Sequence, residues 1–445
     1  NYIGPLLFFW GFTKMFLGSS LMFQKLIDRA ARFMGDLGAL ATKNLRRNTA
    51  RTASIAFLIA MIIGFSFQAV GSYTSERDYI VRQVKFDVGA DISVQLSTTV
   101  NASSTVGIIG KLSGVSSTTI EYGFRAFTPL NAPPTTLVAI DPSKWPKTAH
   151  FERDLFTGGD TSSAFREMEN DNETILLEWG IAKTLKLRLG DYIAVSPLVY
   201  SKTINLRIVG LFGPKTPTQE QMRSPYWSYI PYGLYETMKE EAYSWGKILV
   251  KLKPNADGKA VAEEIRNLQL DDIFIVNSVS ELLELQQSRW SSPAGTPFTF
   301  STAIVGSMDI QRLGVIFAVL AASLGTALVT LVSLKERSRE VGILGARGLS
   351  FNQMVSILMM ENLTIVGFSV FLGAAVGLIV AYGNISAANS MSFGYSPLLR
   401  HLVFPLNSVL TLLACCALVF ASTIIPVIIM SKRDLSEMER IVREV

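Results

Sequence analysis

The sequence predicts an α-helical multi-pass membrane protein with an α+β extracytoplasmic domain inserted between its first and second core helices. The 445 residues are 49% hydrophobic and only 17% charged, which is apolar-rich for a soluble protein of this length. Apolar runs long enough to cross a bilayer of about 30 Å lie near both ends of the chain. Residues 74–310 contain no such run and alternate strand-like segments with Gly, Pro, Asn and Asp turns.

The first fifty residues precede the predicted membrane core. Residues 1–23 are apolar enough for a transmembrane or membrane-embedded helix, although they contain Lys14. In residues 24–50, apolar residues recur at helical spacing with basic residues between them, which predicts an amphipathic connector in the membrane interface. Three arginines at 46–51 follow and are expected in the cytoplasm.

Four apolar runs form the predicted core, at 51–73, 311–334, 353–383 and 403–430. Basic residues precede the first run, so it should run outward and place residues 74–310 outside the cell membrane. The other runs then alternate in direction, with an outer loop at 384–402 and a cytoplasmic tail at 431–445. Every basic cluster near a membrane end falls on the cytoplasmic side, so we expect a multi-pass protein of the plasma (cytoplasmic) membrane, in contact with its lipids.

The outer region reads as a folded α+β domain. Its candidate strands are residues 90–96, 118–127, 135–140, 174–178, 192–199 and 204–212. Residues 247–254, 256–269 and 273–278 have the pattern of a strand, an amphipathic helix and a strand, which predicts a βαβ element. The Gly, Pro, Ser and Thr-rich residues 291–302 are typical of a linker that returns the chain to the membrane.

Motifs for catalysis and for metal or cofactor binding are lacking in the sequence. His150 and His401 are the two histidines, and neither lies in a metal-binding pattern. There is no GxxxxGK[ST] phosphate loop and no GxSxG motif. Cys415 and Cys416 are adjacent in an apolar run, which argues against a disulfide framework. We expect no catalytic, cofactor-binding or metal site in this chain, and the net charge of +5 does not imply nucleic acid as a partner.

Two kinds of polar or small-residue motif remain. Asn101, Asn172 and Asn384 begin N-x-S/T triplets on the predicted outer side, and are either candidate glycosylation sites or chance occurrences. Gly373 and Gly377 form a GxxxG motif, which allows close helix packing in lipid. Packing within the chain and contact between two chains are both open for this motif.

A charged segment at 335–350, KERSREVGILGARGLS, separates two of the apolar runs. Its basic residues place it in the cytoplasm. A simple turn needs only a few polar residues, whereas this segment continues into a helical pattern with an exposed mixed face. We therefore predict a short cytoplasmic helix at 335–352 that binds a soluble partner.

Residues 44–67 and 335–383, together with the domain between them, resemble the permease family of ABC transporters typified by FtsX, MacB and the LolCDE lipoprotein extractor. ERSREVGILGARG is similar to the family's coupling motif, ER-x-R-E-[IV]-G-[IL]-L-[RK]-A-[LI]-G, and departs from it at Gly345 and Arg347. The outer segments ILLEWGIAKTLKLRLGDYIAVS and INLRIVGLF resemble the MacB-like periplasmic core domain. The resemblance implies ATPase contacts by Glu336, Arg337, Arg339, Glu340, Val341, Gly342, Ile343, Leu344, Ala346 and Gly348.

The resemblance also implies a function. ATP and Mg would be bound by separate ABC ATPase subunits, so this chain would be neither an enzyme nor a cofactor-binding protein. It would export or extract a lipoprotein, peptide, lipid or drug-like substrate by mechanotransmission, with an extracytoplasmic cargo or binding protein as a further partner. The alternative is an FtsX-like signalling protein that regulates an extracellular cell-wall enzyme without transport.

Residues 1–43, an extra helix and an amphipathic connector before the core, are similar to the middle of larger family members that carry two permease units in tandem. We therefore expect this chain to be the second unit of a duplicated permease. Otherwise a homodimer would supply the second permease unit.

Overall fold

The computed structural model describes residues 49–291, with gaps at 98, 100–101, 129–134, 153–154, 198–202, 214–226 and 240–243, and residues 351–444, with a gap at 392–397. It also describes a few single positions, at 7, 11, 320, 323–325 and 327–328. The predicted helices at 1–23, 24–50 and 311–334 therefore lie almost wholly outside the described residues, and the charged segment 335–350 does so entirely. The chain divides into two compact units: residues 1–77, 298–390 and 400–445, and residues 78–297 and 391–399.

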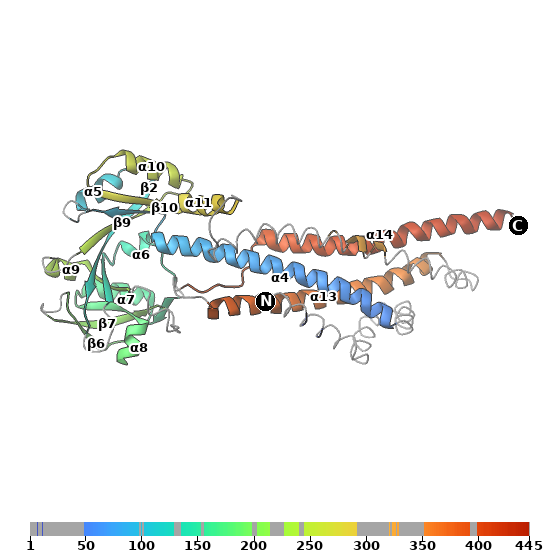
Figure 1. Ribbon diagram of the computed structural model, residues 1–445, viewed down its shortest axis with the longest axis horizontal. Coiled ribbons are helices and arrows are strands. Elements are labelled where there is room, and N and C mark those ends of the chain that lie inside the picture. The colour runs from blue at the N-terminus through green and yellow to red at the C-terminus, as the bar shows by residue number, and fades with distance from the viewer. Residues whose placement is uncertain are drawn as a thin grey trace. The chain divides into compact units, whose positions relative to one another are not determined.

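Three long helices provide most of the described residues of the first unit (Figure 1): α4 (Thr49–Val88), α13 (Phe351–Met391) and α14 (Leu406–Glu444). Within them, Ala56–Val88, Ile365–Ser390 and Leu406–Pro426 are long and apolar enough to span a membrane. Each helix is longer than its predicted apolar run. The α4 helix continues past residue 73 into the second unit, α13 continues into the predicted outer loop, and α14 continues through the predicted tail.

The α4 and α13 helices pack closely and run in the same direction. A Cβ atom added to Gly373 of α13 would lie 2.5 Å from the carbonyl oxygen of Ala60 in α4, and one added to Gly377 would lie 2.9 Å from the Cα of Gly64. Farther along, Ala381 lies against Gly71 of α4. Residue numbers rise together on both helices, so the two are parallel, as the predicted topology requires. Small residues allow this approach because no side chain separates the backbones.

The α14 helix runs antiparallel to α4. Cys415 shares a small buried cluster with Ala69, whereas Val419, one turn later, belongs to a cluster with Ile59 and Ile63. Residue numbers therefore rise along α14 in the direction in which they fall along α4. Large apolar side chains remain exposed on the outside of α13 and α14, which suits contact with lipid.

A mixed sheet of ten described strands forms the second unit: β1 (Ile92–Leu96), β2 (Val115–Ala126), β3 (Thr135–Ile140), β4 (Phe156–Gly158), β5 (Thr174–Glu178), β6 (Tyr192–Val195), β7 (Ile204–Phe212), β8 (Trp227–Pro231), β9 (Ser244–Leu252) and β10 (Ile273–Ser278). Their order is β10-β1-β9-β2-β3-β8-β5-β7-β4, and β6 pairs with β7. The β3–β8 and β5–β7 pairs are parallel, and the other pairs are antiparallel. The α+β fold class predicted for this region is confirmed.

Seven described helices accompany the sheet: α5 (Ala102–Ile109), α6 (Trp145–Thr148), α7 (Thr161–Asn170), α8 (Trp179–Leu185), α9 (Tyr232–Met238), α10 (Gly258–Asn267) and α11 (Val279–Ser291). Acidic side chains cap the N-termini of three of these helices. Asp160, Glu178 and Asp257 accept hydrogen bonds from backbone N–H groups in the first turns of α7, α8 and α10. These contacts satisfy donors that a helix leaves unpaired at its start.

Both faces of the sheet are covered. Successive side chains of a strand point to opposite faces, so Leu137 and Ala139 of β3 belong to one buried cluster, and Val138 and Ile140 belong to another. The first cluster includes side chains from α5, α8, α9 and α10. The second includes Trp145 of α6 and side chains of α7, together with residues from the last part of α4.

The predicted βαβ element is present in its parts, but its strands are not neighbours. β9, α10 and β10 follow one another in the chain, while β1 lies between β9 and β10 and is antiparallel to both. The unit is therefore a split βαβ. Ile92 and Val94 of β1 are fully buried, in the same cluster as side chains of α10. The helix that connects β9 to β10 therefore packs on the inserted strand.

Candidate functional site

The predicted ATPase-contact residues at 336–348 lie outside the described residues. The structure does describe the outer part of α4, residues 74–88, where the predicted membrane helix ends. Its side chains make polar and apolar contacts with several other elements. We consider these contacts as a candidate coupling site, separately for each unit.

In the first unit, an ion pair joins the outer part of α4 to the segment that precedes α14. Arg400 Nε lies 2.6 Å from Glu76 Oε2, and Arg400 Nη2 lies 3.2 Å from Glu76 Oε1. The two side chains are only 15% and 18% exposed. The planar guanidinium matches both carboxylate oxygens, which makes this a directional contact as well as an attraction of charges.

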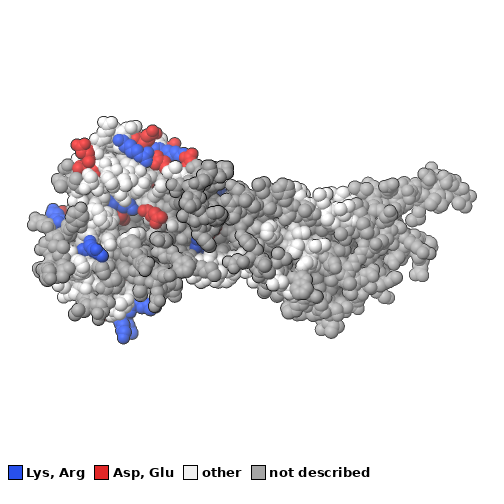
Figure 2. Space-filling view, in the orientation of Figure 1, with Lys and Arg blue, Asp and Glu red and all other residues white. Residues whose placement is uncertain are grey.

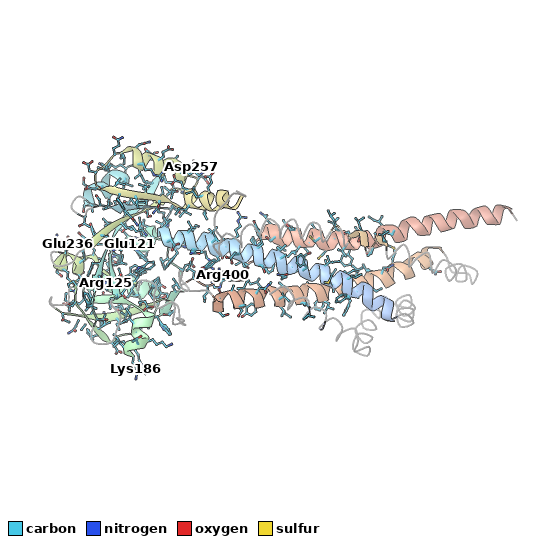
Figure 3. All side chains as sticks on the ribbon, in the orientation of Figure 1. Glu121, Arg125, Lys186, Glu236, Asp257 and Arg400 are labelled. Carbon is cyan, nitrogen blue, oxygen red and sulfur yellow. The ribbon has the colours of Figure 1, made fainter. Side chains whose placement is uncertain are left out.

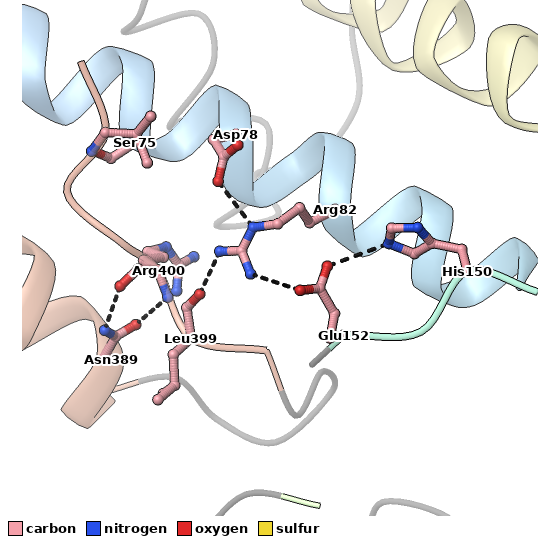
Figure 4. Close-up of polar contacts among 9 residues, drawn as sticks. Ser75, Asp78, Arg82, His150, Glu152, Asn389, Leu399 and Arg400 are labelled. Atoms are coloured by element: carbon pink, nitrogen blue, oxygen red, sulfur yellow. Dashed lines mark hydrogen bonds and ion pairs between the residues drawn. The ribbon is translucent and has the colours of Figure 1, made fainter. Parts of the chain in front are cut away.

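Asn389, near the end of α13, holds the backbone of the same arginine. Its Nδ2 donates to the carbonyl of Arg400 at 3.0 Å, and its Oδ1 accepts from the Arg400 N–H at 2.9 Å (Figure 4). The residues around Arg400 are in neither helix nor strand. Their backbone groups therefore need partners of this kind.

Two hydroxyl groups of α4 bind the backbone of the same segment at Val403. Thr74 Oγ1 donates to the carbonyl of Val403 at 2.5 Å, and Ser75 Oγ accepts from the Val403 N–H at 3.0 Å. We call the set Thr74, Ser75, Glu76, Asn389, Arg400 and Val403 the outer clasp. It joins α4, α13 and the start of the chain into α14 through directional polar contacts.

In the second unit, Arg82 of α4 is the centre of another polar cluster (Figure 4). Its Nε lies 2.9 Å from Asp78 Oδ2, its Nη1 lies 3.6 Å from Glu152 Oε2, and its Nη2 donates to the carbonyl of Leu399 at 2.6 Å. Glu152 also contacts His150 Nε2 at 3.3 Å. All three nitrogen atoms of the Arg82 guanidinium therefore make contacts, because its planar arrangement of N–H donors points in several directions.

The last turns of α4 also pack against α11. Val84 and Val88 of α4 share a buried cluster with Val279, Leu282 and Leu283. The helix that enters the domain and the helix that leads out of its described part therefore lie side by side.

Charged contacts hold α11 to α10. Arg266 donates to both carboxylate oxygens of Glu281, at 2.8 and 2.6 Å, and Lys259 pairs with Glu284. Figure 2 shows acidic and basic side chains mixed on the displayed face of this unit. The position of α11 is thus set from both sides, by apolar packing on α4 and by ion pairs with α10.

The end of α4 is fixed to the sheet. Gly89 has a φ of +87° and its N–H bonds the carbonyl of Lys85, which ends the helix in the left-handed conformation that glycine adopts easily. Lys247 of β9 donates to the carbonyl of Asp87 at 3.2 Å. A cation is favourable here because the helix dipole leaves partial negative charge at the C-terminal end.

Lys247 also lies opposite Glu121 in the β2–β9 pair. Glu121 is buried within the domain (Figure 3), and Trp145 Nε1 donates to it at 2.6 Å. Burial raises the pKa of Glu121, and the charge of Lys247 opposes the shift in part. Burial, with the nearby charge of Glu121, also raises the pKa of Tyr229.

These polar contacts hold elements together at the places where α4 and the sheet meet their neighbours. Among the residues that the structure describes, no group of three or more His, Cys, Asp and Glu side chains could hold a metal ion. The acids around α4 instead contact arginines, a tryptophan or backbone groups at the places where elements meet.

The other residues singled out from the sequence have the following positions. Gly373 and Gly377 face α4 within the same chain. Asn384 is exposed on α13. Asn172 is exposed between α7 and β5, but its amide packs against Gly233 at the start of α9. Asn101 lies outside the described residues.

The clasp and the Arg82 cluster were not anticipated from the sequence. A signal was present, because Glu76 and Arg400 are charges that lie just beyond apolar runs. Their positions are 324 residues apart, however, and no local pattern links them.

Two family models match the chain. The model of the MacB-like periplasmic core domain matches residues 52–268, and the model of the FtsX-like permease C-terminal region matches residues 312–435. Together they extend over the predicted first core helix at 51–73, most of the outer domain and the closing helices. No curated protein sequence matches the chain significantly.

Solved structures of outer domains are also similar to part of the chain. One is the periplasmic region of MacB from Actinobacillus actinomycetemcomitans, with 12% identity and a TM-score of 0.31, covering 46% of this chain and 95% of that one. Another is the extracellular domain of the noncanonic ABC-type transporter YknZ from Gram-positive bacteria, with 11% identity and a TM-score of 0.29, covering 41% of this chain and 100% of that one.

Proposed function

The chain belongs to the FtsX/MacB family of ABC permeases, and we propose that it transmits ATP-driven movement from the cytoplasm to its outer domain. The family provides the permease component of ABC-type systems, in which the ATPase is a separate subunit. In the proposal, two ATPase subunits bind and hydrolyse ATP with Mg, and this chain converts their closure into movement of residues 74–310. The protein lies in the plasma membrane as a multi-pass permease, paired with a second permease unit.

One observation carries the proposal. The α4 helix is continuous over 40 residues, from Thr49 to Val88. At a rise of about 1.5 Å per residue it is about 60 Å long, twice the thickness of the hydrocarbon core. Its last part contributes Tyr79 and Phe86 to a core of the outer domain. A continuous helix is stiff along its axis and passes an axial displacement from one end to the other, so α4 is suited to carry movement into the domain.

The predicted ATPase-binding segment connects to α4 through α13. Residues 335–350 directly precede α13, which begins at Phe351. Gly373 and Gly377 then bring α13 against the backbone of α4. In the proposal, force applied to the cytoplasmic segment reaches α4 through this interface, in addition to the direct route through the helix predicted at 311–334.

The proposed cargo class is a lipoprotein, peptide, lipid or drug-like molecule that the outer domain exports or extracts without passage through a pore. The alternative is FtsX-like control of an extracellular cell-wall enzyme. Both use the same coupling segment and differ in the outer partner. ATP-dependent release of a co-purified cargo supports transport, whereas ATP-dependent activation of a bound hydrolase supports signalling.

The coupling segment provides the test. The chain is co-purified with its ATPase from native membranes and placed in nanodiscs, and Glu340→Ala and Gly342→Leu are compared with the wild type. We expect both variants to lose the ATP-dependent change in hydrogen–deuterium exchange of the outer domain. Glu439→Ala, which removes an acid from the predicted cytoplasmic tail, is the matched control. An unchanged outer-domain response in both variants would show that this segment does not couple the ATPase to the permease.

A further inference from the structure

The outer clasp joins three parts of the first unit at one place. Glu76 lies on α4, Asn389 lies on α13, and Arg400 lies on the segment that leads into α14. The guanidinium of Arg400 contacts Glu76 while its backbone N–H and carbonyl both contact the Asn389 amide. One residue therefore links all three parts simultaneously.

The clasp and the glycine interface resist different movements. Gly373 and Gly377 let α13 approach α4 closely, and larger apolar side chains of both helices pack around them, but such apolar contacts depend less on angle than hydrogen bonds do. Such an interface opposes separation of the helices more than it opposes sliding along their axes. Hydrogen bonds and a two-pronged ion pair depend on angle and distance, so they fix the axial register.

The environment of the ion pair makes it more than an exposed surface contact. Exposed pairs contribute little because solvent and salt screen them. Arg400 and Glu76 are 15% and 18% exposed, and loss of either partner would leave the other charge largely desolvated. The pair is thus expected to hold the register under load.

From this geometry we propose that Arg400 is a positioning residue for coupling: it locks the outer end of α13 and the start of the chain into α14 to α4, so that axial movement of α13 displaces α4. The inference rests on the proposed function and adds a specific residue and route to it. Without the clasp, α13 would slide on the glycine interface and ATP-driven movement would be lost before it reached the outer domain. Arg400 touches no reacting group and acts through Glu76 and Asn389.

The test uses the full chain co-purified with its ATPase in nanodiscs. ATP hydrolysis, melting temperature and the ATP-dependent change in hydrogen–deuterium exchange are measured in parallel, with exchange followed separately in α13 and in residues 244–291. The variants are Glu76→Gln, Arg400→Gln, Arg400→Lys and the charge exchange Glu76→Arg with Arg400→Glu. Arg166→Gln, an exposed arginine on α7, is the matched control.

We expect Glu76→Gln and Arg400→Gln to retain ATP hydrolysis and the response in α13. Their outer-domain response should fall at least about fivefold, the low end of typical coupling between sites. Arg400→Lys keeps the positive charge but cannot bind both carboxylate oxygens of Glu76 as a guanidinium does. We expect it to lose part of the outer-domain response. The charge exchange should restore the outer-domain response, which a general loss of stability would not predict.

Two results would overturn the inference. One is an unchanged outer-domain response in both single variants, and the other is failure of the charge exchange to restore a response in chains that melt like the wild type. In either case the wild-type response leaves the proposed function intact. A wild-type chain with no ATP-dependent response in any segment would overturn the proposed function and the clasp inference together.

Discussion

Trp145 and Glu121 meet inside the outer domain, where the indole Nε1 donates a 2.6 Å hydrogen bond to the carboxylate. The two residues are 3% and 8% exposed. Burial raises the pKa of Glu121, because the ionised form loses its hydration, and Lys247 opposes the shift in part. The interior of the domain therefore contains an acid whose protonation is coupled to folding.

This coupling predicts a pH dependence. The folded-state pKa of Glu121 lies above its ordinary value of 4.5, so folding favours the protonated side chain. Its contribution to the free energy of unfolding is therefore complete below pH 4.5 and is lost as pH rises through the folded-state pKa. Glu121→Gln keeps an acceptor for Trp145 without the charge. We expect the variant to gain melting temperature relative to the wild type as pH rises above about 4.5, and to converge with it below. A difference that is constant with pH would contradict the expectation.

The opposite sign is expected at Glu281. Hydrogen bonds from Arg266 lower the pKa of Glu281, so the stabilisation is present above its ordinary value of 4.5 and is lost as pH falls through the folded pKa. Glu281→Gln should destabilise the attachment of α11 by less than about 1 kcal/mol at neutral pH, because the pair is partly exposed. Faster hydrogen exchange of α11 in Glu281→Gln would measure this destabilisation, and high salt should reduce the difference between variant and wild type. Equal exchange in variant and wild type at neutral pH and low salt would refute it.

Gly377 gives a prediction about membrane packing. A Cβ atom there would overlap the backbone of Gly64 in α4, whereas Gly367 on the same helix has open space around the corresponding position. Gly377→Ala should therefore destabilise the chain by about 1–3 kcal/mol, as overpacking usually does. Gly367→Ala is the matched control and should be neutral or stabilising. Equal melting temperatures in detergent for the two variants would show that the close α4–α13 contact is not important for stability.

Much of the outer domain could be predicted from local sequence. The apolar alternation and bounding turns of residues 204–212 and 273–278 gave the ends of β7 and β10 as the structure has them. β8 was not predicted, since it is short, ends at Pro231 and is stabilised by parallel pairing with β3. The insertion of β1 between β9 and β10 is likewise a long-range property that periodicity does not contain.

The candidate site was harder to predict for the same physical reason. Hydropathy predicted the three described helices that are long and apolar enough to span a membrane, because burial in lipid requires a continuous apolar run. It placed the end of the first run at 73, where charges begin, whereas α4 continues to Val88 because packing in the domain sustains it. The pairing of Glu76 with Arg400 depends on the folded arrangement of α4, α13 and the segment before α14. Charge alone marks such residues without identifying their partners.

Trp245 and Gly123 lie opposite each other in the β2–β9 pair, and the indole ring lies directly over the glycine. A Cβ atom on Gly123 would overlap the ring, so Gly123→Ala must displace Trp245. Because Trp245 is already 42% exposed, the ring has room to move outward, and we expect a loss of only about 1 kcal/mol. Tryptophan fluorescence should shift to longer wavelength, and the shift should vanish when Trp245→Phe is also present. Gly107→Ala, where the added methyl group meets open space, is the control. An unchanged spectrum in Gly123→Ala would mean that the ring does not cover the glycine in solution.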